Sequence, residues 1–199
     1  MKHETLLTQA ESRRICLFLL SMAAVLGIII GAITAVSVSE SENVLIHQYF
    51  SPIHSGNTLF EVFRNTSVTS IIFLSAVFVL GLSAIGQPFG VALLVYRGVG
   101  IGFSVAFMYL QNGIGALPAV LLLVVPKAVI TIFLSVLAVR EMLKLSGSLF
   151  GFIFRGNASD SKNSRVFRLY CIKFLVIAVI MLIVSALDSA LNYIFMDFI

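Results

Sequence analysis

The segment from Ile15 to Val38, ICLFLLSMAAVLGIIIGAITAVSV, decides the class of fold. It carries no charged side chain and exceeds the about 20 residues that a helix needs to cross a bilayer. The whole chain shares this bias: 59% of its 199 residues are hydrophobic and 11% are charged. Soluble domains average roughly 45–50% apolar and about 25% charged residues. The composition therefore predicts an integral membrane protein and argues against soluble, disordered and disulfide-scaffold classes.

Four further apolar stretches are long enough to cross a membrane. We expect an all-α polytopic bundle of about five transmembrane helices in a single domain, residues 1–199, with spans at about 15–38, 68–86, 89–110, 116–139 and 169–191. The break Gly86-Gln87-Pro88 is expected to end the second span and separate it from the third.

Basic residues orient this bundle, because Lys and Arg accumulate in short cytoplasmic loops. They are frequent before the first span and in the connection 140–168, whereas the connection 39–67 holds three glutamates and one base, Arg64. We therefore expect the N-terminus and the loop 140–168 in the cytoplasm, and the loop 39–67 and the C-terminus outside. The net charge of +4 then reflects orientation and is poor evidence for a nucleic-acid partner.

The two long loops differ in composition. The outer loop 39–67 is apolar enough to form short amphipathic helices at the membrane surface, with Leu59, Phe60, Phe63 and Arg64 as candidate partner-binding residues. It would serve either as a docking surface or as a lid on the bundle. In the cytoplasmic loop, residues 141–154 alternate basic with apolar side chains and are expected either to continue the fourth span or to lie along the anionic inner leaflet. Residues 147–164 are rich in Gly, Ser and Asn and are expected to form a flexible connection.

Small residues are expected to set the helix packing. Gly27 and Gly31 are spaced i, i+4, and so are Gly98 and Gly102. This spacing lets membrane helices approach closely, within one subunit or between copies in a homo-oligomer. Together with Gly98 and Gly102, we expect two residues of the break between the second and third spans to shape the packing, Gly86 and Pro88.

Three ionisable residues draw attention inside the predicted spans. At about 1.5 Å per residue, Arg97 and Lys127 fall roughly 13–18 Å from the cytoplasmic end and Asp188 falls near the outer face. An ion pair between Asp188 and either cation is therefore not expected. Arg97 and Lys127 would line a polar cavity, bind an anion or a lipid headgroup, or meet an acid of another subunit. Alternatively, Arg97 extends its long side chain to the inner interface.

No combination of residues in the chain predicts catalysis or a metal site. The three histidines, His3, His47 and His54, lie outside the predicted spans, and the spacing of the last two matches no familiar ligand pattern. The glycines of Arg97 to Gly102 do not follow a strand, so they are no nucleotide-binding signature. We expect a protein that is not an enzyme and has no cofactor.

A resemblance covers about residues 59–139. The segments LGLSAIGQP, residues 80–88, and RGVGIGFSVAF, residues 97–107, resemble the stage II sporulation protein M family, and Pro126 resembles a proline of that family's fourth span. The resemblance implies a membrane scaffold, located at the sporulation septum and the engulfing membrane. It would place the peptidoglycan-degrading stage II sporulation proteins P and D there.

Two functions follow as hypotheses. The first is this non-catalytic scaffold for septal hydrolases during engulfment, in contact with membrane lipid and cell-wall proteins. The second is a subunit of a membrane transporter or channel, with Arg97 and Lys127 along a polar path.

Overall fold

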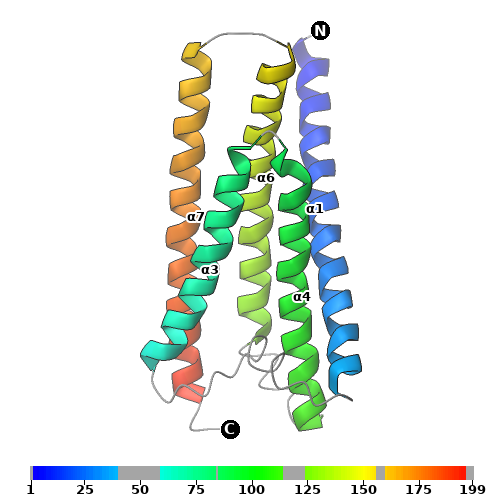
Figure 1. The fold of residues 1–199 in the computed structure, drawn as a ribbon, viewed down its shortest axis with the longest axis vertical. Helices are drawn as coiled ribbons and strands as arrows, with labels where there is room; N and C mark the ends of the chain where they lie inside the picture. The colour runs from blue at the N-terminus through cyan, green and yellow to red at the C-terminus, as the bar shows by residue number, and fades with distance from the viewer. Residues whose placement is uncertain (1, 40–58, 84, 114–123, 156–159, 196–199) are drawn as a thin grey trace.

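The computed structural model describes residues 2–39, 59–83, 85–113, 124–155 and 160–195, and this part of the chain is helical apart from short turns. Its long helices, labelled as in Figure 1, are α1 (Lys2–Ser39), α3 (Leu59–Gly81), α4 (Gly86–Asn112), α6 (Val125–Arg155) and α7 (Asp160–Phe195). The fold is therefore a polytopic helical bundle, as the sequence predicts.

The helices stand side by side, and the two ends of the bundle differ. The start of α1, the α3–α4 turn and the facing ends of α6 and α7 lie toward one end (Figure 1). The end of α1, the start of α3 and the end of α7 lie toward the other. Because basic residues predict the cytoplasm on the side of the first group, we call that the inner end and the opposite one the outer end.

Four described segments are long and apolar enough to cross a membrane: Arg14–Ser37, Phe63–Gly81, Gly86–Leu110 and Phe167–Ala190. They overlap the first, second, third and fifth predicted spans. Of the fourth predicted span, residues 116–123 lie outside the described residues, and the remainder forms the first half of α6. That helix also carries Lys127, Arg140 and Glu141, which interrupt its apolar character.

The turn between α3 and α4 lies earlier than the sequence predicts. Helix α3 ends at Gly81, and Gly86 and Pro88 belong to the first turn of α4 instead of breaking the chain. Proline is tolerated there because a helix leaves its first N–H groups unbonded. The backbone N–H of Gly86 donates to the Ser83 carbonyl at 3.2 Å. A Cβ on Gly86 would stand 2.0 Å from the carbonyl oxygen of Leu80, so the turn requires glycine.

The expected flexible connection at 147–164 is wrong for most of its length. Helix α6 continues to Arg155 and α7 begins at Asp160, and residues 156–159 between them lie outside the described residues. One reason is tertiary contact, since Ser146 Oγ donates to the Ser83 carbonyl at 2.8 Å and so ties α6 to the α3–α4 turn. A glycine or serine costs a helix only about 1 kcal/mol or less, which such packing offsets.

The outer loop also differs from the expectation of separate short helices. Residues 59–67 form the beginning of the long helix α3, and residues 40–58 lie outside the described residues. The second half of the predicted amphipathic region is therefore an extension of a membrane helix.

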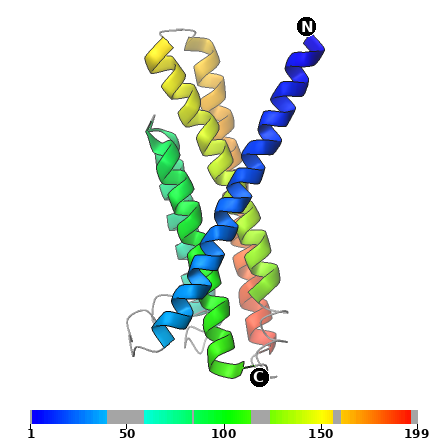
Figure 2. The same cartoon turned by 90° about the vertical axis from the view of Figure 1, so that its right-hand side faces the viewer.

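Helix α1 packs on α4 through glycines on both helices. A Cβ on Gly27 or Gly31 would lie 2.4 Å from the Val95 oxygen or 2.1 Å from the Val99 oxygen, respectively. A Cβ on Gly98 would lie 2.5 Å from the backbone oxygen of Ala24. The two backbones touch directly, as small residues allow in membranes. In the second view, α1 runs obliquely across the other helices (Figure 2).

The apolar core fills the inner half of the bundle. Val77, Leu94, Val139 and Met142 are each at most 1% exposed and come from α3, α4 and α6. Tyr170 of α7 completes this core: its ring lies 5.2 Å from that of Phe78, and its hydroxyl donates to the Phe78 carbonyl at 3.1 Å. The inner half thus holds α3, α4, α6 and α7 together.

Candidate functional site

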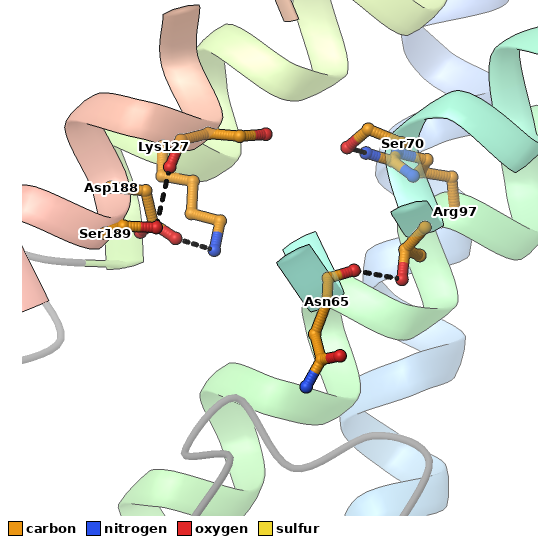
Figure 3. A network of polar contacts seen from close by, with 8 residues as sticks. Asn65, Ser70, Arg97, Lys127, Asp188 and Ser189 are labelled. Atoms are coloured by element: carbon orange, nitrogen blue, oxygen red, sulfur yellow. Dashed lines mark hydrogen bonds and ion pairs between the residues drawn. The ribbon is translucent and has the colours of Figure 1, made fainter. Parts of the chain in front are cut away.

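The candidate functional residues fall into two regions: charged side chains inside the bundle and the outer end of α3. Arg97 is the most central of the charged residues. It lies eleven residues after the start of α4, about 16 Å along the helix, so it is near the middle of the membrane. Figure 3 shows its side chain directed toward Ser70 of α3.

Arg97 contacts α3 through two neighbours. Its Nη2 donates to Ser70 Oγ at 3.2 Å, and its Cζ lies 4.8 Å from the centre of the Phe73 ring. Ser70 and Phe73 are each 7% exposed. The guanidinium therefore points onto the buried face of α3. The alternative prediction, that Arg97 extends its side chain toward the inner interface, is wrong.

Lys127 has a carboxylate partner, contrary to our expectation from the sequence. Its Nζ forms an ion pair with Asp188 of α7 (Figure 3). The Asp188 side chain is 4% exposed and that of Lys127 is 35% exposed. The pair links the outer ends of α6 and α7.

The sequence placed Lys127 too close to the cytoplasmic end, and for this reason the ion pair with Asp188 was not expected. The sequence estimate ended the fourth span at Val139, whereas α6 continues to Arg155. Ser146 of α6 is the residue that meets the α3–α4 turn, and Lys127 lies nineteen residues before it, about 28 Å away along the helix. Lys127 is therefore near the outer end, at the level of Asp188, and about 12 Å farther out than Arg97.

A second charged cluster lies toward the inner end and escaped the sequence reading. Glu141 of α6 accepts from Lys144 Nζ at 2.5 Å and from Lys173 Nζ of α7 at 2.7 Å. Lys173 lies inside the predicted fifth span, where a charged side chain is expected to have a partner. The signal was available, because an acid and a base at the same end of adjacent helices are natural partners.

The four candidate partner-binding residues share the outer end of α3. Leu59 and Phe60 are the first two residues of the helix, and their side chains lie outside the described set. Phe63 is half-buried and Arg64 is exposed. The structure thus places all four on one continuous helix, which begins at the outer end (Figure 1).

The four candidate packing residues lie on α4, as the overall fold shows. Gly98 and Gly102 face α1, where a Cβ on Gly102 would lie 2.1 Å from the oxygen of Ile28. Gly86 and Pro88 lie in the first turn of α4. Arg97 and the packing glycines therefore use different faces of α4, because Arg97 contacts α3 whereas Gly98 and Gly102 face α1.

Long apolar helices with paired charges between them define the class of this molecule, a polytopic helical membrane protein. Residues 17–189 match the family described as stage II sporulation protein M. The chain therefore belongs to the stage II sporulation protein M family and is a sporulation-associated membrane protein. No curated protein and no solved structure matches it in the corresponding comparisons.

Proposed function

We propose that this protein is a non-catalytic membrane scaffold that positions septal peptidoglycan hydrolases during engulfment. Membership of the stage II sporulation protein M family supports a role in sporulation. The resemblance noted in the sequence suggests the stage II sporulation proteins P and D as the hydrolases. Catalysis would then belong to these partners, and this chain would supply their location.

The observation that carries the scaffold proposal is the outer end of α3. This helix begins with Leu59 and presents an exposed Arg64 next to a half-buried Phe63. Such a combination of apolar and basic side chains suits a protein partner on the outer side, because aromatic residues and Arg are enriched at protein interfaces. The apolar core among α3, α4, α6 and α7 would anchor the same helix toward its inner end.

Co-purification tests the scaffold proposal. Phe63→Glu and Arg64→Glu are each expected to reduce recovery of the two hydrolases with the tagged full-length protein by at least about fivefold, roughly 1 kcal/mol of binding. Thr69→Ala is the control on the same helix, because Thr69 is exposed more than one turn away and an apolar side chain suits the membrane-spanning segment. Recovery that survives both changes and deletion of residues 40–58 would show that this end of α3 is not the docking surface.

The alternative, a transporter or channel subunit, now depends on Arg97 more than on Lys127. Lys127 is paired with Asp188 at the outer end, whereas Arg97 contacts a serine and an aromatic ring. A transport path predicts water access to the middle of α4. A cysteine at Ser104, in a chain lacking Cys16 and Cys171, should then react with a membrane-impermeant thiol reagent. Absence of labelling from both sides would exclude such a path.

A further inference from the structure

Arg97 carries more hydrogen-bond donors than its described neighbours satisfy. A guanidinium has five N–H groups, and one of them donates to Ser70 Oγ. Among the described residues, Arg97 Nε is buried without a hydrogen-bond partner, and so is Ser67 Oγ. Ser67 lies one helical turn from Ser70 on the same face of α3. Two unsatisfied buried polar atoms therefore occur close to one contact between α3 and α4, and each costs about 1–3 kcal/mol if it stays unpaired.

The charge of Arg97 is also uncompensated within the described residues. Asp188 pairs with Lys127, and Glu141 pairs with Lys144 and Lys173. None of the ion pairs found in the described part of the chain includes Arg97. An arginine near the middle of a bilayer costs at least about 2.5–3.5 kcal/mol, which an anion bound beside it would offset.

Buried serines gather on three helices from the depth of Arg97 toward the outer end. On α3, α6 and α7 these are Ser67, Ser70, Ser135, Ser185 and Ser189, whereas α1 and α4 bury the apolar Ala35, Phe103 and Phe107 in the outer half. Ser135 lies eleven residues before Ser146, about 16 Å along α6, which is the depth of Arg97. Arg97 is thus at the depth where the buried serines of α3, α6 and α7 begin, and the Lys127–Asp188 pair lies beyond them at the outer end. This arrangement favours approach of a polar ligand from the outer side.

We propose that Arg97, Ser67 and Ser70 form a binding site for an oxyanion, a carboxylate or a phosphate group. The planar guanidinium offers parallel N–H donors that match such a group, and the free Ser67 hydroxyl adds a further donor. Binding satisfies both orphaned atoms and neutralises the charge. The oxyanion comes either from a free small anion or from a lipid headgroup. This inference does not depend on the scaffold role.

The first arm of the test uses free anions. Full-length protein in phosphatidylcholine nanodiscs is titrated with inorganic phosphate and with acetate, and binding is followed by calorimetry. Arg97→Gln is expected to weaken binding at least tenfold. Arg168→Gln is the matched control, because Arg168 is exposed on α7 toward the inner end, away from the proposed site, and it should leave binding within twofold of the unchanged protein.

The second arm uses an anionic lipid. The same proteins are incorporated into nanodiscs that contain phosphatidylglycerol, and native mass spectrometry counts the lipids retained. Retention by the unchanged protein and Arg168→Gln, and loss in Arg97→Gln, identify a headgroup as the source. Ser67→Ala keeps the charge and removes one donor, so at least threefold weaker binding in the responsive arm is expected even if Arg97→Gln does not fold.

Either arm supports the site when binding depends on Arg97 or, where that variant does not fold, on Ser67. Two results would overturn it. One is the absence of probe binding in both arms. The other is binding that Arg97→Gln and Ser67→Ala leave unchanged. A photoreactive residue at position 67 that cross-links to another protein chain in cells would also overturn it, because the site would then hold a protein side chain.

Discussion

Lys127 and Asp188 form an ion pair that joins α6 to α7 near the outer end of the bundle, 61 positions apart in the chain. The two partners differ in environment, since the Asp188 side chain is 4% exposed and the Lys127 side chain is 35% exposed. Asp188 is therefore the buried partner of the pair, and Lys127 supplies the positive charge that compensates its carboxylate.

This asymmetry predicts unequal effects of removing each charge. Lys127→Met leaves the buried Asp188 carboxylate without this cation and should lower the free energy of unfolding by about 2–3 kcal/mol. Asp188→Asn leaves a lysine that can reach the outer interface, and the expected loss is about 1 kcal/mol. Thermal unfolding of the purified protein in detergent measures both. Equal losses, or a larger loss for Asp188→Asn, would contradict the assignment of Asp188 as the more buried partner.

The contact between α1 and α4 predicts a strong effect of side-chain size. Gly102→Leu should separate the two helices, because even a Cβ would lie 2.1 Å from the backbone oxygen of Ile28. We expect a loss of at least about 2 kcal/mol in the free energy of unfolding. Ala92→Leu makes a similar change at an exposed position of the same helix and should be nearly neutral.

Disulfide trapping gives an independent measure of the same contact. Cysteines at Ile28 and Val99, whose backbones lie at the glycine contacts but which are not themselves glycines, are expected to cross-link on oxidation in a chain lacking Cys16 and Cys171, and Gly102→Leu should abolish the cross-link. A cross-link that persists at full yield in Gly102→Leu would mean that α1 tolerates the added side chain and that the glycines are not required for this packing.

The sequence determines the membrane class and the approximate helices well, because long apolar segments without charges have few other uses. It predicts the Gly86 turn less well, since a proline in the first turn of a helix resembles a break. The Lys127–Asp188 pair was missed for a different reason. Depth along a helix depends on where that helix ends, and the estimate measured the depth of Lys127 from Val139, whereas α6 continues to Arg155.

The importance of Arg97 could be predicted from the sequence, whereas its contacts could not. Its position in an apolar helix singled it out, because charges within membranes are commonly functional. Its contact with Ser70 and the ring of Phe73 depends on the rotation of α3 against α4. That rotation is set by side-chain packing in three dimensions, so the partners of Arg97 could not be assigned from spacing alone.

The aromatic cluster at the inner end predicts separate contributions of a ring and a hydroxyl. Tyr170→Phe removes the hydrogen bond to the Phe78 carbonyl and should cost about 1 kcal/mol of unfolding free energy. Tyr170→Ala also removes the ring, which lies 5.2 Å from the Phe78 ring of α3, and should cost about 3–5 kcal/mol. Equal stability of Tyr170→Phe and Tyr170→Ala in detergent would show that the ring does not hold α7 against α3.

The Glu141 cluster predicts a small and salt-dependent effect, unlike that of Lys127. Its two lysines are 45% and 50% exposed, so solvent and ions screen the attraction. Glu141→Gln should lower the free energy of unfolding by no more than about 1 kcal/mol at low salt, and the difference from the unchanged protein should shrink as salt is raised toward 1 M.

Lys127→Met should keep most of its effect at high salt, because the Asp188 carboxylate is shielded from ions. Unfolding measured in detergent across a salt series distinguishes the two. A salt-independent loss of several kcal/mol for Glu141→Gln would show instead that this carboxylate acts as a buried anchor between α6 and α7.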